Sequence, residues 1–139
     1  MLFRSVSQSR YEPEIKEKFE YLTEVSANWK PEDLDSNPKA RAEVARSLAI
    51  FSAFAEGVSL YSSFAVLYSF QMRNLLKGIG QQMKWSVRDE SLHSKMGCRL
   101  FRHMCEEFPE LLGEVRNDIE VAAKLMVEME LKFIEKTLS

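Results

Sequence analysis

Apolar residues recur along much of this chain at intervals of three and four, which is the spacing of one face of an α-helix. The clearest run begins at Pro109, where a proline suits the start of a helix. A shorter run begins at Pro13 and fades near Trp29. No segment alternates between apolar and polar residues for long enough to predict a strand, so the pattern predicts an all-α protein. The apolar positions of the clearest run are Leu112, Val115, Ile119, Ala122, Met126, Met129 and Phe133.

Proline and glycine residues divide the pattern into four helices within one domain, residues 1–139. Lys30–Pro38, with its two prolines, is a predicted linker. At its end, Asn37 is expected to cap the next helix and Pro38 to open it. Proline suits this position because the backbone N–H that it lacks would have no partner in the first turn of a helix. Gly78-Ile79-Gly80 is expected to break that helix. The predicted helices run from Pro13 to about Trp29, from Pro38 to about Lys77, from Gln81 to about Glu107, and from Pro109 onward.

The stretch Leu48–Met72 is almost entirely apolar and carries one charge, Glu56. It is long enough to cross a bilayer, but it has a carboxylate in mid-span, several serines, and neither an aromatic belt nor a strong positive bias at its ends. A helix that is apolar all round is also typical of the centre of a bundle. We therefore predict a helix buried on all sides inside a soluble bundle, and no membrane span.

Composition and charge agree with a soluble, folded domain. Of the 139 residues, 45% are hydrophobic and 29% are charged, and the net charge is −2. This balance excludes a disordered chain and a broad basic surface for nucleic acid. Residues 1–10 lack the apolar run of a signal peptide, and Cys98 and Cys105 lie about 10 Å apart along one predicted helix, too far for a disulfide. These features predict a cytoplasmic protein in a reducing compartment.

Two features of the sequence can carry chemistry. The first is Glu56, because a lone carboxylate in an apolar helix must be protonated, paired or bound to a cation. The second is the pair Glu90 and His93, which are three residues apart and share one face of the third predicted helix. At about 100° per residue this is the apolar face, and Lys84 and Arg102 lie opposite. We therefore expect both side chains to point into the core.

The residues alone leave two interpretations of these three side chains open. In the first, His93 is protonated and forms a core salt bridge with Glu56 or Glu90. In the second, the three side chains bind a metal, because dinuclear sites in helical bundles take Glu from some helices and Glu-x-x-His from others. Carboxylates with one imidazole suit iron or manganese, whereas zinc sites favour more His or Cys.

Two segments resemble the small, radical-generating subunit of class I ribonucleotide reductase. One is Ala55–Ala65, in which a Glu is followed by an aromatic- and serine-rich helix. The other is Trp85–His93, which reads Trp-Ser-Val-Arg-Asp-Glu-Ser-Leu-His. The resemblance is dense over residues 40–107 and includes the separation of Glu56 from Glu90. It implies a ferritin-like helical bundle, here a partial one of about four helices, with a di-iron or manganese–iron centre.

The resemblance also implies roles for individual residues. Glu56, Glu90 and His93 match three of the six protein ligands of the family. Asp89 matches the acidic residue that hydrogen-bonds a ligand His from the other half of the site and lies on the radical-transfer route. Arg88 resembles its neighbour in that network. The three ligands would be half of a complete site.

The resemblance places the remaining functional groups partly outside this chain. Leu60 and Phe64 match positions that line the apolar pocket beside the metals. The radical-bearing Tyr is expected in the family's first metal-binding half, which nothing before Glu56 matches, and neither Tyr61 nor Tyr68 is assigned that role. We therefore expect no catalytic residue in this chain. It resembles the middle-to-late portion of a small subunit, from a split gene or a truncated reading frame.

Three functions compete at this stage. The first is a small-subunit component of ribonucleoside-diphosphate reductase that is inactive alone and works with the large catalytic subunit and a homodimeric or complementing small-subunit chain. The second is a self-paired, di-metal-binding homodimer, because two antiparallel copies bring together four Glu and two His. The third is a structural helical fragment without metal, in which the former ligands form a salt bridge. None of the three involves nucleic acid or a membrane.

Overall fold

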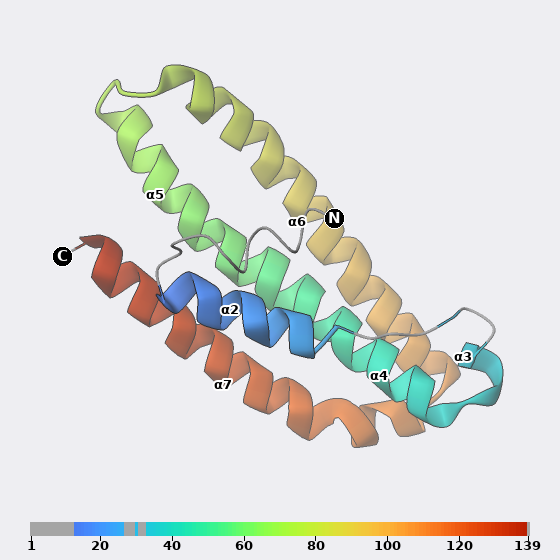
Figure 1. The fold of residues 1–139 in the computed structure, drawn as a ribbon. Helices are drawn as coiled ribbons and strands as arrows, with labels where there is room; N and C mark the ends of the chain where they lie inside the picture. Colours follow the sequence, from blue (N-terminus) through green and yellow to red (C-terminus); the bar gives the residue numbers. More distant parts are fainter. Residues whose placement is uncertain (1–12, 27–29, 31–32, 139) are drawn as a thin grey trace.

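The structure is a computed structural model that describes residues 13–26, 30 and 33–138, so the interpretations that concern Trp29 and residues 1–10 lie outside it. Every described element is a helix, which confirms the all-α prediction (Figure 1). A short helix, α3, lies in the segment predicted as a linker. The elements are α2 (Pro13–Glu24), α3 (Asp33–Ser36), α4 (Pro38–Ala49), η1 (Ile50–Ser59), α5 (Leu60–Met72), α6 (Lys77–Glu107) and α7 (Glu110–Leu138).

One long helical path runs from Pro38 to Met72 through α4, η1 and α5. The Asn37 side chain begins it by accepting hydrogen bonds from the backbone N–H groups of Lys39 and Ala40, at 3.1 and 3.3 Å. These contacts confirm the predicted cap. The middle segment, η1, is a π-helix, in which each backbone N–H bonds to the carbonyl five residues earlier. The predicted long helix is therefore present, but its central part has a different helical geometry.

The turn between α5 and α6 lies at residues 73–76, before the predicted break at Gly78-Ile79-Gly80. Asn74 and Leu76 reverse the chain there, with φ angles of 59° and 51°. The two glycines instead belong to the first turn of α6. A Cβ on the second of them would collide with the side chain of Gln71. The prediction was wrong about the position because the second glycine serves close helix packing and not the reversal of the chain.

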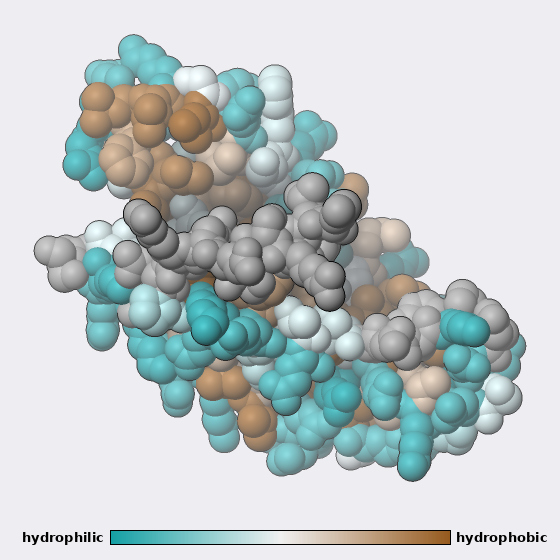
Figure 2. Space-filling view, viewed as in Figure 1, coloured by the Kyte–Doolittle hydropathy of each residue, from teal (hydrophilic) through white to brown (hydrophobic). Residues whose placement is uncertain are grey.

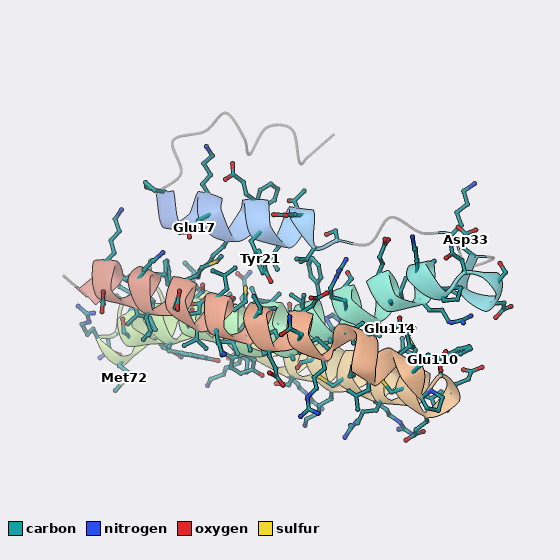
Figure 3. The ribbon with its side chains drawn as sticks, turned by 90° about the horizontal axis from the view of Figure 1, so that it is seen from below. Glu17, Tyr21, Asp33, Met72, Glu110 and Glu114 are labelled. Atoms are coloured by element: carbon teal, nitrogen blue, oxygen red, sulfur yellow. The ribbon has the colours of Figure 1, made fainter. Side chains whose placement is uncertain are left out.

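The long helix lies between α6 and α7 (Figure 1). α2 lies against α7, with Glu17 and Tyr21 on the side that faces α7, and Glu17 pairs with Lys132 of that helix (Figure 3). α6 contacts η1 more extensively than any other element. This arrangement places the centre of the long helix against both of its neighbours.

The apolar seam predicted for α7 is largely confirmed. Leu112 is the exception, because it is 49% exposed and its neighbour Leu111 takes the buried position. Leu111 and Val115 form a core cluster with Ala45 of α4. Ala122, Met126 and Met129 are buried further along the same face. Partly buried side chains that pack around the cluster are Ala42, Phe101, Met104, Cys105, Phe108 and Ile119.

The prediction that the long helix is buried on all sides is wrong for the described chain. Ile50, Ser52 and Ala55 are buried, but most residues of Leu48–Met72 are half-buried because α6 and α7 cover only two of its sides. Among the described residues, Pro38–Met72 is the one helix that is long and apolar enough to cross a membrane by length and composition. Its contacts with α6 and α7 agree with a place inside a bundle.

Large apolar side chains remain exposed on α6 and at the α5–α6 turn. Figure 2 shows apolar residues gathered at the end of the molecule that holds this turn. A contiguous exposed apolar surface often marks a site of interaction with another protein, a ligand or a membrane. Four of these side chains follow one stripe of α6 and are between 53% and 65% exposed. We call Trp85, Leu92, Met96 and Leu100 the α6 stripe.

Candidate metal centre

Glu56, Glu90 and His93 meet at the contact between η1 and α6. Glu56 comes from η1, and Glu90 and His93 come from one face of α6. Each residue offers one oxygen or nitrogen atom, and these atoms all lie within 4.8 Å of one another. The structure therefore brings together the three residues that were predicted as ligands from two separate motifs.

Small residues let η1 and α6 approach closely enough for these side chains to meet. Gly97 of α6 lies against Ser52 of η1, so that a Cβ on Gly97 would collide with the serine side chain. Gly57 lies opposite Ser94, and a Cβ on Gly57 would be 3.2 Å from the Ser94 hydroxyl oxygen. No glycine in the described chain has a positive φ, so these two contribute space and not unusual backbone geometry.

Glu56 lies within the π-helical segment, which is 10 residues long. Its end is marked by the Leu60 N–H, which bonds to the Ala55 carbonyl five residues earlier. A π-helix is rare, and π segments inside α-helices often lie at functional sites. Because the wider turn alters the direction in which side chains leave the helix, this segment sets the direction of Glu56.

The imidazole of His93 lies close to two carboxylates of its own helix. Its Nδ1 is 3.4 Å from Oε2 of Glu90, and its Nε2 is 3.8 Å from Oδ1 of Asp89. The side chains of Glu90 and His93 are 24% and 52% exposed. Glu90 points into the helix contact, as predicted, whereas His93 is more exposed than predicted. The difference arises because η1 covers one side of α6 and His93 lies at the edge of that contact.

Burial and the nearby Glu90 carboxylate both raise the pKa of Glu56, and burial is the larger cause. His93 acts in the opposite direction. When both are ionised, the two carboxylates repel each other across the contact. A proton on one carboxylate or a cation bound between them relieves this repulsion, so the electrostatics favour either protonation or cation binding at this position.

The donor set fits a hard metal ion. Two carboxylates and one imidazole suit iron or manganese better than zinc, whose sites take more His or Cys. Three donors are half of the set of four Glu and two His that dinuclear helical bundles use. The alternative interpretation, a Glu90–His93 salt bridge, also fits the 3.4 Å separation. Both interpretations agree with these distances, and metal binding distinguishes them.

The other residues implied by the resemblance lie around this cluster. Asp89 and Arg88 are exposed on α6, and Asp89 pairs with His93 of the same helix. Phe64 is buried, and its ring meets Tyr61 edge-on with 6.0 Å between ring centroids. Leu60 is half-buried at the start of α5. The apolar pair therefore follows Glu56 along the long helix.

One contact beside the ligands was not predicted. The Tyr61 hydroxyl of α5 hydrogen-bonds the Ser91 hydroxyl of α6 and lies 3.4 Å from the Val87 carbonyl. Ser91 directly follows Glu90, so this contact ties the ligand-bearing turn of α6 to α5. Both residues lie within the two motifs, but no spacing rule pairs side chains that belong to different helices.

The other histidine and the two cysteines of the chain also lie on α6. His103 is exposed and pairs with Glu106 at 3.4 Å, away from the candidate ligands. Cys98 and Cys105 are free and lie on the same helix, as the spacing predicted. Burial raises the pKa of the Cys105 thiol, which agrees with a packing role.

Comparison with known proteins now identifies the family. Residues 4–139 match the family described as ribonucleotide reductase, small chain. The chain belongs to this family. The all-helical structure agrees with this assignment. Small chains of ribonucleotide reductase are metal-dependent in general, and Glu56, Glu90 and His93 are the candidate ligand group in this small chain.

Individual relatives carry the same family name. The chain is 36% identical over 99 residues to a probable ribonucleoside-diphosphate reductase small subunit of Invertebrate iridescent virus 3. This alignment covers 70% of this chain and 26% of the relative. It is 33% identical over 135 residues to a probable small subunit of Invertebrate iridescent virus 6, with coverages of 88% and 36%. It is 31% identical over 94 residues to the subunit beta of Chlamydia pneumoniae, with coverages of 67% and 27%.

These relatives are much longer than the matched region. The chain spans 26%, 36% and 27% of their respective lengths. No solved structure matches the chain. The family model establishes the family of this small chain, and the structure establishes its helical fold. Because the chain spans about a third or less of these relatives, the activity of an assembled enzyme is proposed below.

Proposed function

We propose that this small chain is a component of ribonucleoside-diphosphate reductase and holds part of the dinuclear metal centre that generates the radical for deoxyribonucleotide synthesis. The observation that carries the proposal is the meeting of Glu56, Glu90 and His93, with donor atoms within 4.8 Å, in a chain of this family. The donor set suits two irons, or one manganese and one iron.

In this proposal the three side chains are metal ligands. Glu56 and Glu90 would hold the ions through their carboxylates. His93 binds through one ring nitrogen while a carboxylate faces the other, which fixes the orientation and tautomer of the ring. When bound, the dinuclear centre supplies the activation of O₂ and the one-electron oxidation from which the radical arises.

Neighbouring residues are proposed to control water and the exit of the radical. Phe64, which is buried, and Leu60 exclude water on the long-helix side of the ligands. Asp89 faces His93 at 3.8 Å and is proposed to accept a hydrogen bond from a ligand histidine of the other half of the site. Arg88 extends this polar path along the exposed side of α6 toward the large subunit.

The active assembly is expected to need further chains. Three donors make half of a dinuclear site, and the relatives are about three to four times as long as the matched region. We therefore expect the remaining ligands and the radical-bearing Tyr to come from a complementing small-subunit chain or segment. The large catalytic subunit is the expected partner that uses the radical. A soluble, cytoplasmic location fits this assembly.

A self-paired metal-binding homodimer is the second candidate. It is favoured by the half-exposed His93 and by the α6 stripe beside it, because both would be covered by a second copy. Two copies would supply four Glu and two His. The metal-free structural fragment is the third candidate, and the Glu90–His93 separation of 3.4 Å favours it.

Equilibrium Mn(II) binding, followed by electron paramagnetic resonance together with native mass, tests the proposal. We expect the purified chain to bind Mn(II) and Glu56→Ala to bind it at least ~10-fold more weakly, which is the usual scale for losing a group at a metal site. About two metals per dimer would favour the self-paired homodimer. Binding that is indifferent to Glu56→Ala would contradict the proposal and favour the structural fragment.

A matched control comes from the same helix. His103 and Glu106 repeat the three-residue spacing and the 3.4 Å separation of a histidine and a glutamate, and among the described residues no second carboxylate joins them in a ligand group. Glu106→Ala is therefore expected to leave Mn(II) binding unchanged. A loss of binding in Glu106→Ala equal to that in Glu56→Ala would mean that the metal does not distinguish the candidate site from the surface.

A further inference from the structure

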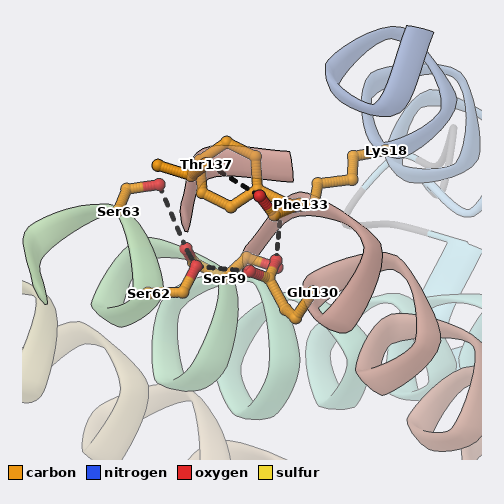
Figure 4. Close-up of polar contacts among 7 residues, drawn as sticks. All are labelled: Lys18, Ser59, Ser62, Ser63, Glu130, Phe133 and Thr137. Carbon is orange, nitrogen blue, oxygen red and sulfur yellow. Dashed lines mark hydrogen bonds and ion pairs between the residues drawn. The ribbon is translucent and has the colours of Figure 1, made fainter. Parts of the chain in front are cut away.

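A second polar cluster lies on the α7 side of the long helix, away from the candidate metal ligands. We define the Glu130 cluster as Lys18 of α2, Ser62 of α5 and Glu130 of α7 (Figure 4). The Glu130 carboxylate pairs with the Lys18 ammonium and accepts a hydrogen bond from the Ser62 hydroxyl. The side chains of Lys18 and Glu130 are only 13% and 5% exposed. The Lys18 ammonium also lies 4.4 Å from the centroid of the Phe133 ring.

The Glu130 cluster contacts the place where the π-helix ends. The Ser62 hydroxyl lies 2.9 Å from the carbonyl of Ser59, which is the last residue of η1. The hydroxyl of Ser63 lies 3.4 Å from the same carbonyl. Figure 4 shows these serines grouped beside Glu130. The Ser62 hydroxyl has one hydrogen, so it donates either to the Glu130 carboxylate or to the Ser59 carbonyl, and it lies between the end of the π segment and a carboxylate that α7 and α2 hold in place.

Stability alone is a weak reason for such a cluster. A buried ion pair loses much of its Coulomb energy to desolvation, and well-packed apolar residues often stabilise a protein equally well. A buried polar group can instead select one arrangement among several of similar energy. The long helix can in principle adopt more than one arrangement, because its π segment could begin or end at other residues or be replaced by the more common α-helix.

The register of the π segment has a direct consequence for Glu56, which lies three residues before Ser59. Advancing an α-helix by one residue rotates each side chain by about 100°. A shift in the position of the π-to-α transition would therefore turn Glu56 away from Glu90 and His93. On the other side of η1, Gly97 and Ser52 hold the segment against α6. The π segment is thus held from the α6 side and, at its end, from the α7 side.

We propose that the Glu130 cluster positions Glu56 by holding the π-to-α transition in register, through Ser62, which lies in the first turn of α5 directly after the transition. The inference rests on the proposed function in one respect, namely that Glu56 is a metal ligand. Ser62, Glu130 and Lys18 are positioning residues in this view, because none of them belongs to the ligand cluster. Their loss is expected to release the end of η1 and to weaken metal binding without removing a ligand.

The same pair of helices offers a matched control. Lys132 of α7 and Glu17 of α2 form an ion pair at 3.4 Å, with side chains 55% and 45% exposed. This pair joins α2 to α7, as Lys18 and Glu130 do, but none of its described contacts reaches α5. Glu17→Gln therefore removes an α2–α7 ion pair and leaves the Ser62 contact intact.

Hydrogen exchange of the metal-free full chain gives the first measurement, and Mn(II) affinity gives the second. We expect Ser62→Ala and Glu130→Gln to speed amide exchange within residues 55–60 more than within residues 111–122 of α7. We expect both variants to bind Mn(II) about 10-fold more weakly, at the lower end of the usual effect of an outer contact on a metal site. Ser62→Thr keeps the hydroxyl and should restore both properties, and Glu17→Gln should change neither.

The outcomes separate this inference from the proposed function. Exchange that rises equally in residues 55–60 and 111–122, or unchanged Mn(II) affinity in Ser62→Ala, would overturn the positioning role and leave only a structural one. If the unaltered chain binds no Mn(II), the proposed function fails. In that case exchange alone decides whether the cluster holds the π segment, and faster exchange confined to residues 55–60 supports it.

Discussion

At the scale of single residues, Glu56 shows most clearly what the site requires. It is half-buried in η1, it faces the carboxylate of Glu90, and His93 only partly offsets that charge. The pKa of Glu56 is therefore raised above its ordinary value of 4.5. In the metal-free protein this group contributes most to stability when it is protonated, and the contribution is lost as the pH rises through the raised pKa.

This residue gives a prediction about pH. Glu56→Gln removes the charge that burial and Glu90 make unfavourable, so the metal-free variant should have a higher melting temperature than the unaltered chain at pH 7. The difference should shrink as the pH falls through the raised pKa toward 4.5, because the native side chain is then neutral as well. Thermal unfolding in the presence of a chelator, at pH 7 and near pH 4, measures both effects.

Glu106→Gln is the control for this comparison, because Glu106 is exposed and pairs only with exposed His103 among the contacts described. Surface pairs of this kind contribute about 0–1 kcal/mol, so its melting temperature should stay close to that of the unaltered chain. An unaltered chain that is as stable as Glu56→Gln at pH 7 would show that Glu56 carries no electrostatic strain.

At the scale of elements, the contact between η1 and α6 makes the site possible. Its two closest points involve glycines and serines, so the backbones of the two helices approach without large side chains between them. Tyr61 and Ser91 add a hydrogen bond between α5 and α6 one residue beyond Glu90. The ligands therefore depend on helix packing as well as on their own rotamers.

This contact predicts the effect of adding one methyl group. Gly97→Ala places a Cβ against the Ser52 side chain and should destabilise the chain by about 1–3 kcal/mol, the usual cost of overpacking. It should also weaken Mn(II) binding, because α6 moves away from Glu56. Urea denaturation and a binding titration measure the two effects.

Gly113→Ala provides the matched comparison, because a Cβ on Gly113 of α7 would meet nothing within 4 Å. There the helix propensity of alanine should dominate and raise stability by up to about 1 kcal/mol. Equal effects of the two substitutions would mean that the η1–α6 contact adjusts easily and does not determine where the ligands lie.

At the scale of the whole molecule, the three candidate ligands lie beside an exposed side of α6. His93 is half-exposed, and the α6 stripe lies uncovered along the same helix. The sequence has two histidines and no second Glu-x-x-His. In the proposed function, another chain or segment covers the exposed side of α6 and completes the site.

The expected result for the isolated small chain follows directly. With the large catalytic subunit as its only added partner, it should not reduce ribonucleotides, because the proposed function assigns the remaining ligands and the radical-bearing Tyr to another chain or segment. An assay of deoxyribonucleotide formation, with metal and O₂ supplied, tests this. Detectable turnover in that assay would contradict the assignment of the remaining ligands to another chain.

Much of the fold and part of the site followed from local patterns. The helix period, the Asn37 cap and Pro109 predicted the helices because these signals act between residues close in the chain. The three-residue spacing placed Glu90 and His93 on one face for the same reason. The α5–α6 turn was misplaced because Asn74 and Leu76, which are not glycines, adopt the left-handed conformation.

The sequence by itself thus determined the helical class, the family motifs and the Glu90–His93 pair. The resemblance also predicted that Glu56 joins that pair, whereas tertiary structure alone decided that the segment around Glu56 is a π-helix and that Ser62 reaches Glu130. It also decided that His93 lies at an edge and not in the core. Local spacing is set by the chain's own geometry, whereas these features depend on contacts between helices that are distant in sequence and become defined only when the helices pack.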